Sequence, residues 1–275
     1  TPSILKNVKN NFDLHDVSYE DKTSLNNIDP KILEKLNIRQ RTFGNLNEDK
    51  IFYVIKRTPG TGMFSNITFI LNHLKICKKY DVIPIIDMEK FSTIYNESIR
   101  FRKNLNAWNY YFDNLNKYSL EEVYKSKNVL ITDNKFFNFF SYNIDKDNEL
   151  IELLNTKIKI NKYMKKCYLK AFKMFKNKKI LAIHFRGTSY KRSAGHPLPA
   201  TKKQMTNLID SLNSKHNYDK IFLATEEKDY RDFLKKRYSN LIYYSKHFAK
   251  KRNISSEDRK GVRYQLGKEV IIDMM

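Results

Sequence analysis

Basic and imidazole side chains gather directly after one apolar segment of the sequence. His184 and Arg186 end the run "ILAIHFR" at 180–186, and His196 follows in the next polar stretch, immediately before a proline. Because side chains two positions apart in a strand share a face, His184 and Arg186 would point to the same side. A guanidinium can hold two oxygens of a diphosphate, and an imidazole can accept a proton near neutral pH. The stretch could therefore bind a phosphorylated ligand and transfer a proton, although either histidine alone is more typical of a structural residue.

A second candidate site is the glycine-containing turn "RTPGTGMFSN" at 57–66. It leads into a segment of helical spacing, and the free N–H groups at a helix N-terminus suit a phosphate. Gly60 and Gly62 have the first spacing of a dinucleotide-binding GxGxxG motif, but Ser65 stands where the last glycine would be. No Gly-Lys-Ser follows as in a P-loop, so the pattern also fits a plain tight turn. Asn66 adds a side-chain amide one turn into the helix, where it could face the same ligand.

Alternating strands and helices must position these two sites. In the first half, branched and aromatic runs predict strands at 51–56, 82–88 and 128–133. Apolar residues at helical spacing predict a helix at 63–80. Strand, glycine turn, helix and strand form one βαβ unit. Ligands bind beyond the carboxyl ends of parallel strands, and the glycine turn lies at such an end.

The second half of the chain repeats this pattern. Strands are predicted at 178–185, 219–225 and 240–245, with helices at 199–212 and 226–238. Thr201 and Gln204 have the spacing of a capping box for the first of these helices. Thr225 is the predicted N-cap of the second. His184 and Arg186 thus end the first strand of this half.

These patterns predict an α/β protein with two Rossmann-like domains. The first domain spans 1–146, one long connecting helix follows at 147–177, and the second domain spans 178–275. The final residues, "GKEVIIDMM", stop within an apolar periodic segment that no cap, glycine or proline ends. We therefore expect the second domain to be truncated at its C-terminus and the chain to be part of a longer protein.

The balance of charge is strongly basic. Lys and Arg number 52 against 30 Asp and Glu, giving a formal net charge of +22. Such a field attracts nucleic acids, anionic lipids and phosphorylated small molecules. The lysines are spread along the chain, so a generally basic, solvated surface explains the charge equally well. The lysine- and aromatic-rich segment at 162–179 also fits a non-catalytic protein that binds nucleic acid or another anionic polymer, and composition leaves that alternative open.

Features of membrane, secreted and metal-binding proteins are missing from the sequence. It has no run of 18 apolar residues, no signal peptide at its start and no metal-binding spacing of its 2 cysteines. No DxD follows a predicted strand either. The sequence therefore predicts a cytoplasmic protein without a metal site, which its basic surface could bring to an anionic inner membrane.

Three segments resemble motifs of known glycosyltransferases. "HFRGTSYK" followed by "GHP", at 184–197, resembles a stretch of the α1,6-fucosyltransferases and the His-x-Arg motif of protein O-fucosyltransferases. Upstream, "GTGMFSN" at 60–66 resembles the Gly-Arg-Phe-Gly-Asn loop of the latter group. "GKEVIIDMM" at 267–275 resembles the segment in which an aspartate reads guanine. The three segments occur along the chain in the same order as in the family.

The resemblance implies a GT-B-like pair of Rossmann domains facing a cleft. In this family the cleft holds GDP-fucose, and the anomeric carbon is inverted without a metal or other cofactor. By resemblance, Arg186 would hold the β-phosphate with help from Asn66, and Asp273 would hydrogen-bond the guanine. His184 would shape the nucleotide pocket.

The sequence also departs from the family motif. The second arginine of the motif is Gly187 here, its aspartate is Ser189, and Ala194 stands near the place of the glutamate proposed as a base. The donor could therefore carry fucose, another 6-deoxysugar or a heptose. His196 is the best available general base by residue type. We hypothesise a bacterial, inverting glycosyltransferase that adds a sugar to a glycan or polysaccharide acceptor, such as a capsule, and binds no specific nucleic acid.

Overall fold

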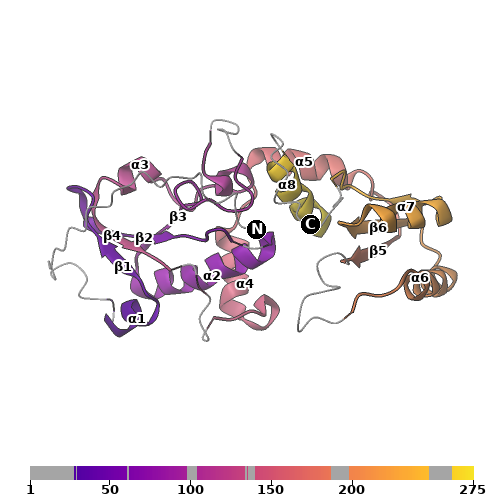
Figure 1. Cartoon of the computed structure of the whole chain (residues 1–275), viewed down its shortest axis with the longest axis horizontal. Coiled ribbons are helices and arrows are strands. Elements are labelled where there is room, and N and C mark those ends of the chain that lie inside the picture. The colour runs from indigo at the N-terminus through magenta and orange to yellow at the C-terminus, as the bar shows by residue number, and fades with distance from the viewer. Residues whose placement is uncertain are drawn as a thin grey trace, which may run out of the picture.

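The computed structural model describes residues 28, 30–60, 62–97, 104–133, 135, 140–186, 198–247 and 262–275. Within these ranges the chain forms two separate β-sheets, one in each half of the molecule (Figure 1). Both sheets contain parallel strands and have helices packed beside them. The α/β prediction is therefore confirmed.

The first sheet has the strand order β1-β4-β2-β3. Its strands are β1 Arg39–Arg41, β2 Leu46–Ile55, β3 Ile83–Ile86 and β4 Ser126–Ile131. β2 is central and parallel to both β3 and β4, whereas β1 pairs antiparallel with β4. The three strands predicted in this half are confirmed, and β1 adds a short edge that the sequence pattern did not indicate.

Both faces of β2 are buried, which explains its run of branched and aromatic residues. Tyr53 and Ile55 lie in the largest hydrophobic core together with α2 (Met63–Tyr80). Phe52 and Val54 belong to a smaller core on the opposite face. α2 is the helix predicted after the glycine turn, and it returns the chain to β3, so the expected βαβ unit is present.

The long connecting helix predicted at 147–177 is wrong, because the segment forms two helices. α4 covers Asn148–Lys157 and α5 covers Lys162–Phe172. Between them the backbone is extended, and Ile160 forms a bridge with Phe112. Asn161 then caps α5 by accepting a hydrogen bond from the Met164 N–H (2.9 Å). A β-branched residue and a strong N-cap residue in succession favour this break.

The second sheet has the order β5-β6-β7, and all its strand pairs are parallel. Its elements are β5 Ile180–Phe185, α6 Lys202–His216, β6 Lys220–Thr225, α7 Lys228–Arg237 and β7 Leu241–Ile242. The capping box of Thr201 and Gln204 is confirmed. The prediction that Thr225 is the N-cap of α7 is wrong, because the N-cap is Glu227. Thr225 ends β6, and its hydroxyl accepts a hydrogen bond from the Glu227 N–H.

The last helix, α8 (Val262–Met274), packs against the first half of the molecule. The Tyr264 N–H donates to the Glu97 carboxylate (2.7 Å), and the Tyr264 ring stacks on Tyr111 at a centroid distance of 5.5 Å. Farther along the helix, Asp273 accepts a hydrogen bond from Ser245, which follows β7. α8 therefore connects the two halves, and with α5 it lies between the two sheets in Figure 1.

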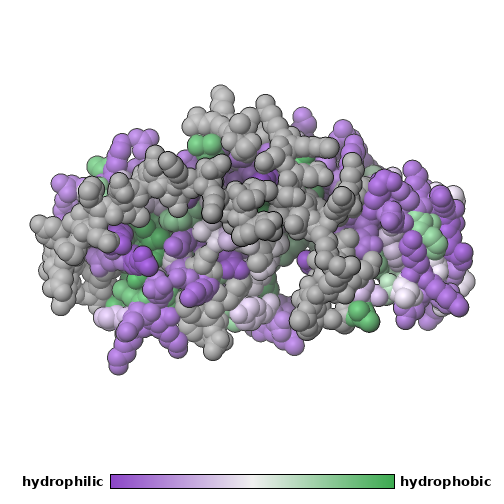
Figure 2. Space-filling model, viewed as in Figure 1, coloured by the Kyte–Doolittle hydropathy of each residue, from purple (hydrophilic) through white to green (hydrophobic). Residues whose placement is uncertain are grey.

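Short helical segments complete the first half, namely α1 Pro30–Lys35, η2 Ala107–Tyr110, α3 Leu120–Val123 and η3 Ile144–Lys146. On the face that Figure 2 shows, the described surface is mostly hydrophilic at the end that holds α6 and α7, in keeping with 30% charged residues. Over the described ranges, no helix has the length and apolar character needed to cross a bilayer.

Candidate functional site

The turn after β2 has a backbone that only glycine suits. Gly60 has a φ of 73°, which is unfavourable for residues with a Cβ. A Cβ there would lie 3.1 Å from both terminal atoms of the Asn66 amide and 3.2 Å from the Arg57 carbonyl oxygen. Gly60 therefore allows the turn to close over the first turn of α2.

Asn66 is buried beneath this turn, with 1% of its surface exposed. Its backbone N–H donates to the Gly62 carbonyl (3.1 Å), and its side-chain amide lies against Gly60. Sequence reasoning placed this amide toward a ligand, and the structure places it under the backbone that a ligand would approach. Its contact with a ligand stays a prediction.

The N-terminus of α2 is open at Gly62. Gly62 is the N-cap, and no side chain caps the helix from that position. A Cβ on Gly62 would meet no atom of the described residues within 4 Å. The Met63 N–H donates to the Tyr95 hydroxyl, and the remaining uncapped N–H groups of the first turn can bind an anion, as the sequence predicted for this turn. Thr61 lies outside the described residues.

The loop after β3 supports the turn after β2. The Ile94 N–H donates to the Pro59 carbonyl (2.9 Å), and the Thr58 hydroxyl donates to the Ser92 carbonyl (2.6 Å). β2 and β3 are parallel, so their carboxyl ends meet at the same edge of the sheet. Two loops therefore build one rigid wall at this edge.

Tyr95 of this loop links the two predicted binding regions. Burial raises the pKa of its hydroxyl to about 12, while a hydrogen bond from the Met63 backbone N–H and the positive charge of Arg186 act in the opposite direction. Met63 is the first residue of α2, and Arg186 follows β5 of the other sheet. Arg186 therefore lies within electrostatic reach of the N-terminus of α2.

At the carboxyl end of β5, the side chains alternate between a buried and an exposed face, as the sequence predicted. Ile183 and Phe185 are buried, whereas His184 and Arg186 are exposed on the other side of the strand. Phe185 stacks on Tyr230 of α7 at a centroid distance of 3.6 Å, which fixes the buried face. The shared side of His184 and Arg186 is confirmed.

His196, the predicted general base, lies outside the described residues together with Gly187, Ser189 and Ala194. Its role therefore stays a prediction.

Asp273 is held on α8 with one carboxylate oxygen unused. Ser245 donates its hydroxyl to Oδ2, and Oδ1 is buried with no hydrogen-bond partner among the described residues. Burial, reinforced by the negative charge of Glu269, raises the pKa of Asp273 to about 7, against the effect of the Ser245 hydrogen bond. Ser245 follows β7, so Asp273 lies near the edge of the second sheet where β5 ends at Arg186.

α8 reaches the N-terminus of α2 through Gly267. A Cβ at Gly267 would overlap the Tyr111 hydroxyl and lie 3.0 Å from Met63 Cε. Sequence reasoning missed both Gly267 and Tyr95. Tyr95 follows a predicted strand at its carboxyl end, which was a usable signal, but nothing in the local pattern of Gly267 indicates its contact with Tyr111.

The described residues contain no group of three or more His, Cys, Asp or Glu side chains that could hold a metal ion. The candidate site would combine backbone N–H groups of α2, the Arg186 guanidinium and the half-buried Asp273 carboxyl group. It can bind an anion at the α2 N-terminus and a hydrogen-bond donor at Asp273.

Comparison with known proteins gives a match in structure only. No family model matches the sequence, and a search of curated proteins gave no match. The fucosyltransferase NodZ from Bradyrhizobium is 14% identical, with 82% of this chain and 84% of that chain covered at a TM-score of 0.50. A structure of NodZ alpha-1,6-fucosyltransferase soaked with GDP-fucose is 13% identical over the same shares of the two chains, at a TM-score of 0.48. The resemblance predicted from the motifs is thus confirmed at the level of the fold, which is a mixed α/β fold similar to that of a fucosyltransferase.

Proposed function

We propose that the chain is a glycosyltransferase that moves a sugar from a GDP-linked donor to a glycan or polysaccharide acceptor, with inversion and without a metal ion. The observation that carries this proposal is the effect of both Met63 and Arg186 on the Tyr95 hydroxyl. It supports the prediction that two phosphate-binding elements, from different sheets, act on one ligand. The fold similarity to a fucosyltransferase supports the same reaction class.

In this proposal the diphosphate of the donor lies between Arg186 and the N-terminus of α2. The guanidinium can contact two phosphate oxygens, and N–H groups of the first turn of α2 other than that of Met63, which donates to Tyr95, would donate to the same diphosphate. As the bond to the sugar breaks, negative charge grows on the diphosphate. Donors that are already in place stabilise that charge without reorganisation.

Asp273 is the proposed guanine-binding residue. Guanine offers an N1–H and an amino group, and a carboxylate can accept from both. Oδ1 of Asp273 is buried and has no partner within the described ranges, so a guanine that reached it would satisfy this acceptor. A base without these donors would leave it unpaired.

The transfer itself is a direct displacement. An acceptor hydroxyl oxygen forms a bond to the anomeric carbon while the bond from that carbon to the GDP oxygen breaks. The electron pair leaves with GDP, and the proton of the hydroxyl goes to His196, with His184 shaping the pocket. The donor sugar is fucose-like or a heptose. Residues 1–146 would supply the acceptor side and 178–275 the donor side of the cleft.

We further propose that the enzyme works at an anionic membrane surface. Lys162, Lys165 and Lys166 are exposed on α5, and the same helix exposes 51% of Leu169 and 47% of Phe172. Lysines beside exposed apolar side chains are typical of helices that lie on anionic bilayers. A bacterial enzyme that builds a surface polysaccharide such as a capsule would meet its acceptor there.

The rival hypothesis, a non-catalytic protein that binds nucleic acid, makes a different structural prediction. It requires a long basic groove, whereas an enzyme requires the glycine turn and Arg186 to meet at one site. The action of Arg186 on Tyr95 beside the α2 N-terminus favours the enzyme.

Thermal unfolding with GDP, UDP and CDP tests the proposal directly. A ligand at a hundredfold excess over its Kd stabilises the native state by about 2.7 kcal/mol. We expect GDP to raise the Tm and the two pyrimidine nucleotides to have little effect. Arg186→Ala should abolish the shift, whereas Lys203→Ala, which removes an exposed charge on α6, should keep it. Equal shifts with all three nucleotides, or none with GDP, would contradict the proposal.

A further inference from the structure

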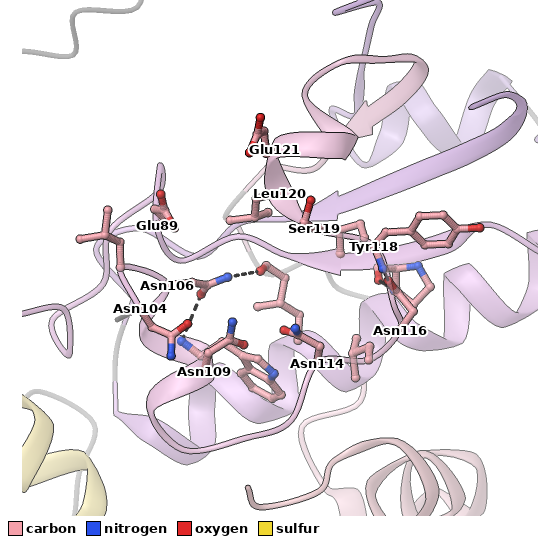
Figure 3. A pocket seen from close by; sticks show the side chains of 16 residues that line it. Glu89, Asn104, Asn106, Asn109, Asn114, Asn116, Tyr118, Ser119, Leu120 and Glu121 are labelled. Atoms are coloured by element: carbon pink, nitrogen blue, oxygen red, sulfur yellow. Dashed lines mark hydrogen bonds between the residues drawn. The ribbon is translucent and has the colours of Figure 1, made fainter. Parts of the chain in front are cut away.

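A second pocket lies along the outer edge of the first sheet, beside β3. Its volume is about 280 Å³, and it is lined by β3, by the loop after it, and by the segments at 104–109 and 114–121. Figure 3 shows its 16 lining side chains, of which 5 are asparagines. The residues assigned to the donor site are not among them.

The edge of β3 is already closed, so the pocket cannot take a peptide strand. The Asn106 side chain donates to the Ile86 carbonyl (2.8 Å), and the Asn116 side chain donates to the Pro84 carbonyl (2.6 Å). Pro84 has no N–H to offer an incoming strand. Two asparagines therefore occupy the backbone positions that strand addition would need.

Other asparagines face the pocket itself. Asn104, Asn109 and Asn114 line it, and Figure 3 shows their amides along one wall, opposite Ser119 and Leu120. The Oδ1 atom of Asn109 is buried and has no hydrogen-bond partner in the described part of the chain. A buried polar atom without a partner costs free energy, so a ligand that donates to it would be favoured.

The charge of the lining sets this pocket apart from the rest of the protein. None of the 16 residues that line it is a lysine or arginine, although the chain has 52 of them. Its ionisable side chains are the exposed carboxylates of Glu89 and Glu121, the latter paired with Lys125 at 2.7 Å, and the phenol of Tyr118. The lining offers no cationic side chain to a phosphate, a nucleic acid or a uronic acid. The ligand that fits is uncharged.

Amide groups beside apolar side chains match a sugar ring. A hydroxyl both donates and accepts, and an amide offers two donors and one acceptor, so the two groups satisfy each other. Ile85, Leu115 and Leu120 supply apolar surface for the C–H faces of a pyranose. The pocket volume of about 280 Å³ lies just below the range of about 300–1,000 Å³ that is usual for small-molecule sites, so the ligand would be as small as a single ring.

We propose that this pocket binds one neutral sugar unit of the acceptor glycan. The unit donates a hydroxyl hydrogen to Asn109 Oδ1 and accepts from the amide groups beside it. Its assignment to the acceptor rests on the proposed function, whereas binding of a neutral sugar follows from the pocket alone. The pocket would thus anchor the acceptor chain away from the reacting hydroxyl.

Saturation-transfer NMR and titration calorimetry with methyl glycosides test this proposal. The probes are the methyl glycosides of glucose, galactose, mannose, fucose, N-acetylglucosamine and glucuronic acid, without any nucleotide. We expect at least one neutral glycoside to saturate the protein and methyl glucuronide to bind about tenfold more weakly. Asn109→Leu should weaken the neutral glycoside about tenfold, because the acceptor atom is lost.

The Tm of each variant distinguishes a loss of glycoside binding from misfolding. Asn109→Leu removes a polar atom that had no partner, so its Tm should stay the same or rise. Asn116→Leu loses the bond to Pro84 and should lower the Tm. Asn155→Leu, on the exposed side of α4, should leave glycoside binding unchanged. No saturable binding of any neutral glycoside, or equal binding by Asn109→Leu, would overturn the proposal.

The same measurements keep this proposal apart from the proposed function. Arg186→Ala should abolish the GDP shift and leave glycoside binding intact. A protein that binds GDP but no glycoside would refute only the sugar pocket. A protein that binds glycosides but not GDP would refute the glycosyltransferase proposal and the assignment of the sugar to an acceptor.

Discussion

The two strand ends of the proposed donor site are built in different ways. At the end of β2, the turn at Gly60 encloses a buried Asn66 and is bonded to the loop after β3. At the end of β5, His184 and Arg186 project from the strand as exposed side chains. The first region offers backbone donors whose positions are fixed by packing, and the second offers long side chains that are exposed at the surface.

This difference separates structural from ligand-dependent effects. A change in the turn after β2 disturbs packed atoms, so it should affect the stability of the free protein. A change in an exposed side chain costs little folding free energy, because surface substitutions usually fall within about 0.5 kcal/mol. Its effect should show only when the ligand is bound.

The largest expected effect is on Arg186. Arg186→Ala should weaken GDP binding about a hundredfold or more, since a hydrogen-bonded charge pair to a phosphate is lost. Because the Arg186 side chain is exposed, its loss should change the Tm of the free protein by less than about 2 °C. Arg186→Lys should recover little, because an ammonium does not reproduce the fork of a guanidinium. Titration calorimetry with GDP measures this, and full recovery by lysine would contradict the bidentate contact.

The next effect, on His196, concerns rate and not affinity. His196→Ala should lower kcat about a hundredfold, the usual range for losing a positioned base, and leave GDP affinity within about twofold. Single-turnover kinetics on a working acceptor, with calorimetry on the same variant, measures the split. Normal turnover by this variant would show that His196 is a loop residue and that the base comes from elsewhere.

The fold was largely predictable because local sequence patterns indicate where strands and helices form. The βαβ unit around α2 and the parallel strands β5 and β6 follow from runs of apolar residues and their spacing. The prediction of one connecting helix was wrong because the helical spacing of apolar residues in this lysine-rich segment continues through the break at Ile158–Asn161. Its bridge from Ile160 to Phe112 joins residues far apart in the sequence, and local patterns do not contain such contacts.

The candidate site was predictable only in its strand ends. Gly60 and Arg186 were found because a turn and a strand end have recognisable neighbours. Tyr95 and Gly267 were not found, because what matters about them is a contact with another element: Tyr95 with Met63, and Gly267 with Tyr111. Such contacts depend on how α8 and the loop after β3 pack, which no local spacing encodes.

Two glycine substitutions in the turn after β2 separate effects on stability from effects on GDP binding. Gly60→Ala places a Cβ at a φ of 73° and 3.1 Å from the Asn66 amide, so it should destabilise the protein by about 1–3 kcal/mol. Gly62→Ala is the matched control, because its φ is −58° and a Cβ there meets no atom of the described chain within 4 Å. It should keep the Tm and weaken GDP binding, since the methyl group enters the space before α2. Denaturant unfolding and calorimetry check both, and equal losses of stability would contradict the assigned backbone.

The smallest expected effect is the pH dependence at Asp273, which tests whether the carboxyl group of α8 belongs to the donor site. Its pKa is raised from an ordinary 3.8 to about 7, so in the folded protein it keeps a proton that the unfolded chain has released. Its contribution to stability is therefore complete below pH 3.8 and is lost as the pH rises through about 7. Guanine needs the deprotonated form, so GDP affinity should rise over the upper part of this range and binding should release a proton.

Asp273→Asn should remove the change near pH 7 from both the stability and the GDP affinity, although Ser245 and Glu269 still face the side chain. Asp210→Asn is the control, because the bonds from Tyr238 and Arg237 lower the pKa of Asp210. The contribution of Asp210 is present at neutral pH and is lost only in acid, which is the opposite sign. Tm values at pH 5, 6, 7 and 8, with and without GDP, measure the difference. If Asp273→Asn and the wild type show parallel profiles in both series, Asp273 neither titrates near neutral pH nor contacts the nucleotide, and the role of α8 is confined to joining the two halves.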